Sequence, residues 1–320
     1  MIKVNGEEVK VEHFPDNTQR ITFKVDPHPK MMMPDNRFII DWRYESDEEC
    51  MTLLYIVRHI RSTKDILRFP IAPHIELNMN YMPNARMDRT KASDEVFTLK
   101  TFAEFINFLD LDAVNVLDPH SDVTPALIKN VVVWKPEREI RNVISKVYGE
   151  QVETLGKTTG GKPLIFFFPD AGAMKRYSEF ITKTFEDYVM YMEKKPEMTI
   201  MYGNKIRNWK TGKIESLEIL DGSGAKATSW DGVIIMVDDI IAYGGTFFYS
   251  ANALSKMNPE GVIYAYATHT ENSVLDEKNS KMLTLLETGT VKKLFTTDSL
   301  YTGSHEDIEI VEGGHCSWFD

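Results

Sequence analysis

The segment from 232 to 255 carries the residues best suited to chemistry. An apolar stretch leads into Asp238 and Asp239, and Tyr243-Gly244-Gly245-Thr246 then opens a segment rich in small residues. This order predicts a strand, a loop at the strand's carboxyl end and a helix, which is where open α/β sheets bind ligands. Glycines and a helix's first N–H groups bind anions, and the two acids suit a ribose diol or a magnesium ion. An ordinary strand-to-helix turn with a solvated acidic pair fits the composition equally well.

Alternating strand and helix signals must position this segment. In the first half, a helix is predicted over 46–61, a strand over 67–75, a helix over 95–109 and a strand over 113–117. In the second half, strands are predicted over 164–168, 198–202, 232–237 and 262–267, with helices over 137–148, 175–193 and 246–257. Such alternation predicts mainly parallel sheets covered by helices. We expect two α/β domains, residues 1–135 and 136–320.

Composition excludes several classes of protein. The 320 residues include 37 Lys and Arg against 48 Asp and Glu, so the net charge is −11. This acidic balance argues against a nucleic-acid partner. Cys50 and Cys316 are the only cysteines, and no apolar run reaches the length of a membrane span. We expect a soluble cytoplasmic protein with no membrane partner.

The segment V-D-D-I-I-A-Y-G-G-T at 237–246 resembles the ribose 5-phosphate loop of the ribose-phosphate pyrophosphokinases, or phosphoribosyl pyrophosphate synthetases. That family reads V-D-D-I-I-D-T-x-G-T there. Other family motifs are matched in the same order by F-P-D-N-T at 14–18, N-A-R-M-D-R at 84–89, L-D-P-H at 117–120, F-P-D-A-G at 168–172 and N-K-I-R at 204–207. The resemblance implies two tandem domains similar to type I phosphoribosyltransferases.

The resemblance also implies a reaction and its residues. Magnesium-dependent transfer of the β,γ-diphosphate of ATP to the anomeric hydroxyl of a sugar phosphate would release AMP, in nucleotide or NAD synthesis. Lys205 and Arg207 would stabilise the developing charge, and His120 and Asp170 would hold magnesium. The ATP-binding residues would be Phe14, Asp16, Asn17, Thr18, Arg86, Met87 and Asp88. The ribose-phosphate loop would be Asp238, Asp239, Ala242, Tyr243, Gly244, Gly245 and Thr246. A homo-oligomer is expected.

One departure from the family bears on the acceptor. Ala242 and Tyr243 replace the family's Asp-Thr, which removes a hydroxyl donor and adds an aromatic ring beside the 5-phosphate. We therefore expect the acceptor to be either ribose 5-phosphate or a sugar with a larger 5-substituent, such as ADP-ribose. Asp170 could also serve simply as a helix N-cap.

Two alternative functions stay open. One is a phosphoribosyltransferase that consumes phosphoribosyl pyrophosphate to modify a base. The other is a non-catalytic regulatory subunit, which Thr18, Met87 and Ala242 favour. AMP released from ATP would separate the first alternative from a pyrophosphokinase.

Overall fold

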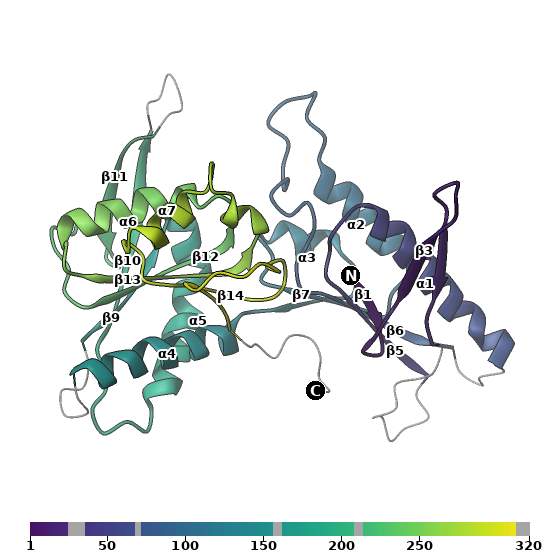
Figure 1. The fold of residues 1–320 in the computed structure, drawn as a ribbon, viewed down its shortest axis with the longest axis horizontal. Coiled ribbons are helices and arrows are strands. Elements are labelled where there is room, and N and C mark those ends of the chain that lie inside the picture. Colours follow the sequence, from purple (N-terminus) through teal and green to yellow (C-terminus); the bar gives the residue numbers. More distant parts are fainter. Residues whose placement is uncertain (25–35, 68–71, 156–161, 208–213, 312–320) are drawn as a thin grey trace. The chain divides into compact units, whose positions relative to one another are not determined.

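The computed structural model describes residues 1–24, 36–67, 72–155, 162–207 and 214–311, except for the side chains of 63–67, 152–155, 205–207 and 214–216. These residues form two compact units, which lie within Met1–Lys135 and Pro136–Gly313. Each unit is an α/β structure with its own sheet (Figure 1). None of the described helices combines the length and the apolar character that crossing a membrane requires.

Unit 1 contains a six-stranded sheet in the order β2-β1-β5-β6-β7-β8, in which β5 to β8 are parallel. A separate hairpin consists of β3 and β4. The strands are β1 (Ile2–Val4), β2 (Glu7–Glu8), β3 (Lys10–His13), β4 (Gln19–Thr22), β5 (Arg37–Trp42), β6 (His74–Met79), β7 (Ala113–Leu117) and β8 (Val131–Trp134). The helices are α1 (Glu48–Leu67), α2 (Thr98–Phe108) and α3 (Val123–Leu127).

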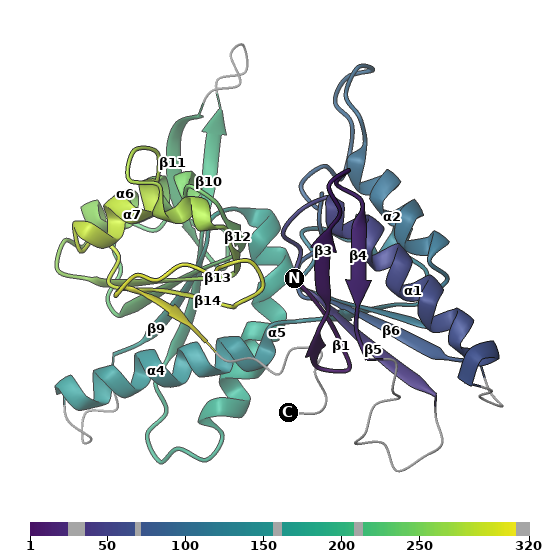
Figure 2. The ribbon, with the colours of Figure 1, turned by 45° about the vertical axis from the view of Figure 1, so that its right-hand side comes forward.

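The helices of unit 1 cover one face of its sheet. Because β5 to β8 lie side by side in chain order, right-handed crossovers bring each connecting helix to the same face. The core on that face joins Leu53 and Ile56 of α1 and Phe102 of α2 to alternate strand residues such as Phe38 and Leu77. Figure 2 shows α1 and α2 side by side over the strands.

The opposite face of this sheet carries a line of polar side chains. Asn78 donates a hydrogen bond to Asp41 (2.7 Å), and Asn115 donates one to Asn78 (2.9 Å). Trp134 completes the line by donating to Asn115 (3.1 Å). Asp41, Asn78 and Asn115 occupy one register position across three parallel strands, and both asparagines are buried. Because a buried amide must be hydrogen-bonded, this line fixes the strand register.

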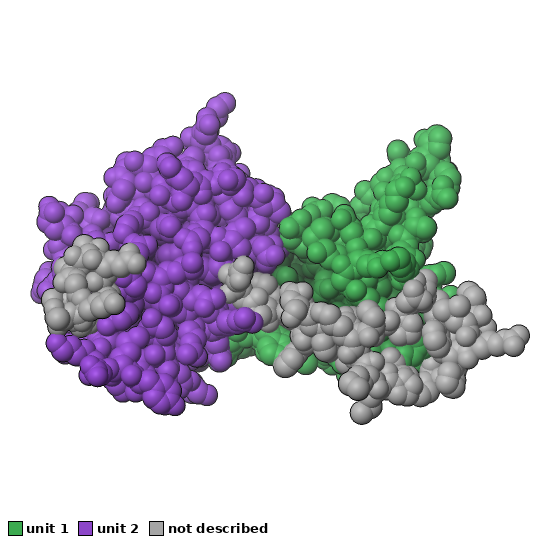
Figure 3. All heavy atoms as spheres, turned by 60° about the horizontal axis from the view of Figure 1, so that its bottom comes forward, with its two compact units in different colours: residues 1–135, 314–320 green, residues 136–313 purple. Residues whose placement is uncertain are grey.

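Unit 2 (Figure 3, purple) contains a seven-stranded sheet, and its strand order is β11-β10-β9-β12-β13-β14-β15. All neighbours are parallel except β10 and β11. The strands are β9 (Leu164–Phe168), β10 (Met198–Arg207), β11 (Ile214–Asp221), β12 (Val233–Ile241), β13 (Val262–Thr270), β14 (Leu294–Thr296) and β15 (Ile308–Ile310). The helices are α4 (Glu137–Leu155), α5 (Ala171–Val189), α6 (Gly245–Met257), the 3-10 helix η1 (Asn272–Leu275) and α7 (Lys281–Glu287).

Helices cover both faces of the unit 2 sheet. The chain moves outward in one direction from β9 to β10 through α5, and in the other direction from β12 to β13 through α6. Right-handed crossovers therefore place α5 and α6 on opposite faces. Phe166 and Ile235 face the core under α4 and α5, whereas Phe167 and Met236 face the core under α6 and α7. The predicted parallel sheets flanked by helices are confirmed.

Several boundaries differ from those predicted. The strand expected over 67–75 was wrong: α1 continues to residue 67, and β6 spans His74–Met79. The residues 68–71 of that prediction lie outside the described chain. Glu76 and Asn78 interrupt the apolar pattern of β6 because Glu76 pairs with Arg37 and Asn78 belongs to the polar line. Helix α5 begins at Ala171 rather than at 175.

We predict that Asn78→Leu lowers the free energy of unfolding by about 2–4 kcal/mol, because Asp41 loses this donor and Asn115 loses its acceptor. Urea denaturation measures the loss. Leu77→Met is the matched control, since Leu77 faces the apolar core and this swap costs less than about 1.5 kcal/mol. An Asn78→Leu protein as stable as the control would contradict the structural role of the line.

Candidate active site

The strand order of unit 2 reverses between β9 and β12, which lie side by side at the centre of the sheet. The connections that follow these two strands leave toward opposite faces. Open α/β sheets bind their ligands at such a switch point, outside the carboxyl ends of the strands. The structure places Asp170 directly after β9, and Asp238 and Asp239 in the last half of β12. Three predicted site residues therefore flank one switch point.

The two acids of β12 are neighbours whose carboxyl groups interact with each other. Their side chains lie within hydrogen-bonding reach, and Asp239 also pairs with Arg176 of α5. The backbone N–H of Asp239 donates to the Asp238 carboxylate (3.0 Å). Asp239 is buried, whereas Asp238 is partly exposed. Asp238 is therefore the more accessible of the two acids.

Charge is concentrated at this point. Burial, then the charge and hydrogen bond of Asp239, and finally Asp170 raise the pKa of Asp238 well above its usual value. Arg176 of α5 forms an ion pair with Asp239 at 3.3 Å. The guanidinium thus pairs with Asp239, while Asp239 and Asp170 both act on Asp238. A cation or a set of sugar hydroxyls would relieve the remaining repulsion.

Asp170 has the capping role that its sequence also allowed. Its side chain accepts a hydrogen bond from the Ala173 N–H (3.0 Å), so it is the N-cap of α5. Magnesium in nucleotide sites commonly takes one or two protein ligands, and phosphates and water fill the rest. Among the described residues, no group of three His, Cys, Asp or Glu side chains is arranged to hold a metal. The donors fit a magnesium ion held mainly by substrate phosphates.

The loop between β12 and α6 is fixed by backbone contacts. The Tyr243 carbonyl accepts hydrogen bonds from the N–H groups of Lys281 (2.7 Å) and Met282 (3.1 Å) at the start of α7. Gly244 has a φ of 75°, and a β-carbon there would lie 2.5 Å from that of Met282. Only glycine fits this position. The loop is thus held against α7, and the Tyr243 side chain is left exposed.

The first turn of α6 is open for an anion. Gly244 is the N-cap, and no side chain caps the helix among the described residues. The first intrahelical bond runs from the Phe248 N–H to the Gly244 carbonyl, so the N–H groups of Gly245, Thr246 and Phe247 precede it. A β-carbon on Gly245 would meet no atom within 4 Å. This arrangement of free space, N–H donors and the Thr246 hydroxyl suits a phosphate group.

The residues predicted to bind ATP lie in two parts of unit 1. Phe14 to Thr18 form the turn of the β3–β4 hairpin, where Asp16 accepts hydrogen bonds from the N–H (3.0 Å) and the hydroxyl (2.7 Å) of Thr18. Asn17 adopts a positive φ of 63° in this turn. Phe14 is 51% exposed, so its ring is available to a ligand. The hairpin is anchored on α1, because His13 and Gln19 both bind Glu48.

The second part follows the carboxyl ends of neighbouring strands of the unit 1 sheet. Arg86, Met87 and Asp88 follow β6, and Arg86 is exposed. His120 follows β7 and is partly buried. Because β6 and β7 are adjacent and parallel, both segments leave the same edge of the sheet.

Lys205 and Arg207 lie on β10, which continues beyond the strand predicted over 198–202. Strand β10 pairs with β9 only as far as Tyr202, and its remaining residues pair with β11. Five residues at about 3.3 Å each carry the strand roughly 16 Å past that pairing. The antiparallel pairing of this part of β10 with β11 was not predicted from the sequence. The structure does not describe the side chains of Lys205 and Arg207.

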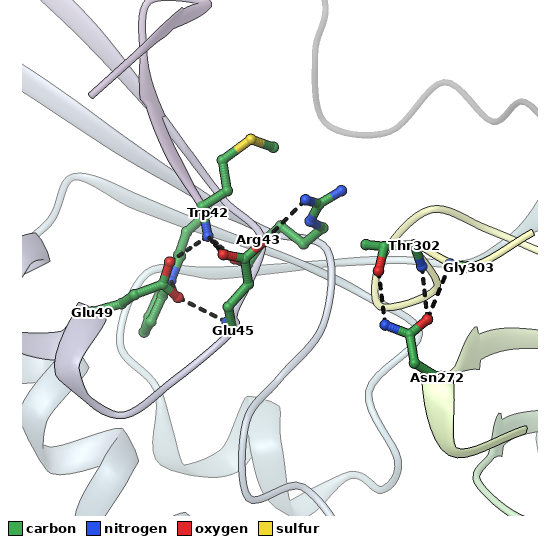
Figure 4. Close-up of polar contacts among 8 residues, drawn as sticks. Trp42, Arg43, Glu45, Glu49, Asn272, Thr302 and Gly303 are labelled. Carbon is green, nitrogen blue, oxygen red and sulfur yellow. Dashed lines mark hydrogen bonds and ion pairs between the residues drawn. The ribbon is translucent and has the colours of Figure 1, made fainter. Parts of the chain in front are cut away.

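Two polar anchors were not predicted from the sequence. Asn272 accepts hydrogen bonds from the N–H groups of Thr302 (3.0 Å) and Gly303 (3.2 Å), and donates to the Thr302 hydroxyl (2.7 Å) (Figure 4). It joins the loops that follow β13 and β14. In unit 1, Glu49 accepts from Trp42 (2.9 Å) and from the Glu45 N–H (2.8 Å), which fixes the loop after β5 (Figure 4). An Asn or Glu in a polar segment gives no local sequence signal for such a role.

Comparison with known proteins places the fold. No family model matches the chain, and no curated protein matches its sequence. The phosphoribosylpyrophosphate synthetase of Mycobacterium smegmatis has a similar structure, with a TM-score of 0.61 and 13% identity over 95% of this chain and 85% of that chain. The hypoxanthine phosphoribosyltransferase of Staphylococcus aureus aligns with 42% of this chain and 65% of that chain, at 13% identity and a TM-score of 0.27. The chain therefore shares the fold of that phosphoribosylpyrophosphate synthetase, with two α/β units that each contain a mainly parallel sheet.

We predict that Asp238→Asn raises the melting temperature at about pH 8 by at least roughly 2 °C, and has no such effect near pH 4. Because the pKa is raised in the folded protein, native stability is full below the unfolded value of 3.8 and is lost as the pH rises through the folded value. Asparagine does not ionise, so the variant does not lose this stability as the pH rises. Asp231→Asn is the control, since the Asp231 side chain is 86% exposed. Equal effects of Asp238→Asn at both pH values would contradict the raised pKa.

Proposed function

We propose that this protein is a magnesium-dependent pyrophosphokinase that transfers the β,γ-diphosphate of ATP to the anomeric hydroxyl of ribose 5-phosphate or of a 5-substituted relative such as ADP-ribose. The observation that carries the proposal is the switch point of unit 2. There, two acids suited to a ribose diol precede an uncapped helix start suited to a 5-phosphate. The fold shared with a phosphoribosylpyrophosphate synthetase along 95% of the chain supports the same reaction.

In the proposed reaction the anomeric oxygen bonds to the β-phosphorus of ATP. The bond from that phosphorus to the α,β-bridging oxygen breaks, and AMP leaves with that oxygen. Such a transfer depends mainly on position and on neutralisation of charge. Unit 1 would carry ATP through the Phe14 to Thr18 turn and through Arg86, Met87 and Asp88. Asp238 and Asp239 would bind the ribose hydroxyls, and the segment from Ala242 to Thr246 would bind the 5-phosphate.

Magnesium would supply positive charge to the phosphates during the transfer. The residues that the sequence resemblance assigns to magnesium are Asp170 in unit 2, which would offer a carboxylate oxygen, and His120 in unit 1, which would offer an imidazole nitrogen. Lys205 and Arg207 would bind the transferred diphosphate. Both residues lie on the part of β10 that extends past its pairing with β9. This position supports the role, because basic residues there lie beyond the carboxyl end of β9.

The surroundings of the loop favour an acceptor with more than one phosphate at the 5-position. Tyr243 is 46% exposed, so its ring could pack against a group beyond the first phosphate. The Lys281 ammonium lies 5.6 Å from the centre of the Phe248 ring, in the first turn of α6. A second phosphate would meet a cation there. The product would then feed NAD or nucleotide synthesis.

Incubation with ATP and Mg²⁺ tests the function. We expect AMP and a diphosphorylated sugar, identified by mass spectrometry, in parallel reactions with ribose 5-phosphate and ADP-ribose. Asp170→Asn should lower AMP release by at least about 100-fold, because asparagine keeps the α5 cap but removes the carboxylate. Base-dependent consumption of phosphoribosyl pyrophosphate without AMP would instead favour a phosphoribosyltransferase. If no AMP is released from ATP with either sugar, the proposal is contradicted.

Gly245→Ala tests the phosphate position itself. Its methyl group meets no atom within 4 Å, so the fold accepts it, but the methyl group would occupy the space proposed for the 5-phosphate. We expect the KM for the sugar to rise by about 10-fold or more, with no loss of melting temperature. Gly149→Ala is the matched control, since Gly149 lies within α4 and also has open space around it. An unchanged KM in Gly245→Ala would remove the phosphate from this position.

A further inference from the structure

The two central strands of unit 2 are paired along only part of their length. The pairing of β9 with β12 runs from Leu164↔Val233 to Phe167↔Met236 and ends there among the described residues. Phe168 still pairs with Tyr202 of β10, and β12 continues beside β13 to Ile241. The acids of the proposed sugar site thus lie where the backbone hydrogen bonds between these strands have ended. A direct link between these two strand ends must therefore come from side chains.

Arg176 links these two strand ends. It lies in the second turn of α5, the helix that begins directly after β9, and its guanidinium pairs with Asp239 of β12 at 3.3 Å. The guanidinium also lies 5.4 Å from the centre of the Tyr177 ring. That ring is fully buried and stacks on Phe168 at the end of β9, with 6.3 Å between ring centres and 7° between ring planes. Arg176 is therefore anchored to the β9 side while it holds the β12 side.

The contact controls the acid pair as a whole. Asp239 is only 3% exposed, so its charge depends on a partner cation. Its backbone N–H in turn donates to the Asp238 carboxylate. A change in the Asp239 side chain therefore reaches Asp238, which is partly exposed. Without Arg176, the two neighbouring carboxyl groups would repel each other and the geometry toward a ribose diol would be lost.

We propose that Arg176 is a positioning residue, which braces the ends of β9 and β12 and orients the Asp238–Asp239 pair for the sugar hydroxyls. The inference rests on the proposed function, because it assigns the sugar to this switch point. Arg176 acts through Asp239 and need not touch the sugar. Arginine suits the role better than lysine, since its planar fork can hold a carboxylate and lie against an aromatic ring at once.

The test compares Arg176→Met with Arg176→Lys and with a matched control, Lys293→Met. Lys293 pairs with Glu309 at 2.8 Å elsewhere in unit 2, and its side chain is 26% exposed against 30% for Arg176. Binding of ribose 5-phosphate and of ADP-ribose is measured by calorimetry without ATP. The KM values for sugar and for ATP, and the melting temperatures, are measured in parallel.

We expect Arg176→Met to weaken binding of the sugar by about 10-fold to 100-fold and to leave the KM for ATP within about twofold. Arg176→Lys should recover part of the affinity. Lys293→Met should lower the melting temperature as Arg176→Met does, while its sugar affinity stays that of the wild type. If Arg176→Met does not fold, Arg176→Lys decides, with an affinity several-fold below the wild type expected.

Three results would overturn the inference. They are sugar affinity unchanged in the Arg176 variants, equal weakening in Lys293→Met, and a KM for ATP that rises in step with that for sugar. The proposed function fails separately, if the wild type binds sugar but releases no AMP. In that case the calorimetric comparison still decides the role of Arg176. A wild type that binds neither sugar overturns both.

Discussion

The reversal of strand order at the centre of the unit 2 sheet determines where this protein can hold a charged ligand. Because the chain leaves β9 and β12 toward opposite faces, the described crossovers diverge from the space after the carboxyl ends of these strands. Asp170 follows β9 and caps α5, and the acids of β12 precede the glycine-containing loop to α6. The polar groups that a core would exclude are thereby gathered at one point of the sheet.

This arrangement costs stability. An acid with a raised pKa, a buried carboxylate with one arginine partner and a helix start without a side-chain cap each oppose folding. The large apolar cores on both faces of the sheet offset that cost. Gly244 shows how closely the loop is fitted, since any side chain there would collide with Met282. A rigid loop holds its N–H groups in place before the ligand arrives, which favours binding.

The sequence predicted the parts of the site that lie close together in the chain. Asp238, Asp239 and the segment Tyr243 to Thr246 form one continuous pattern, and the structure keeps it as strand, loop and helix start. Arg176 could not be found in this way, because it meets Asp239 only through the packing of α5 on the sheet. The polar residues of β6 likewise made that strand hard to predict, because the Asn78 amide forms its hydrogen bonds with residues of the neighbouring strands. Local pattern thus predicted the strand, the loop and the helix start, whereas tertiary contacts determine what supports them.

The sheets of the two units differ in strand order, and this difference bears on the roles proposed for the units. Unit 1 has its parallel strands in chain order, so its helices share one face and the other face is held by a line of amides. Among the described strands such a sheet has no switch point, and the residues proposed to bind ATP accordingly lie on segments outside its strands, as Phe14 and Arg86 do. Separate segments would suit the proposed nucleotide, which offers a flat base and several phosphates at separate points. The compact switch point of unit 2 would suit the proposed sugar, because the acids and the helix start that would bind its hydroxyls and its 5-phosphate lie close together in the chain.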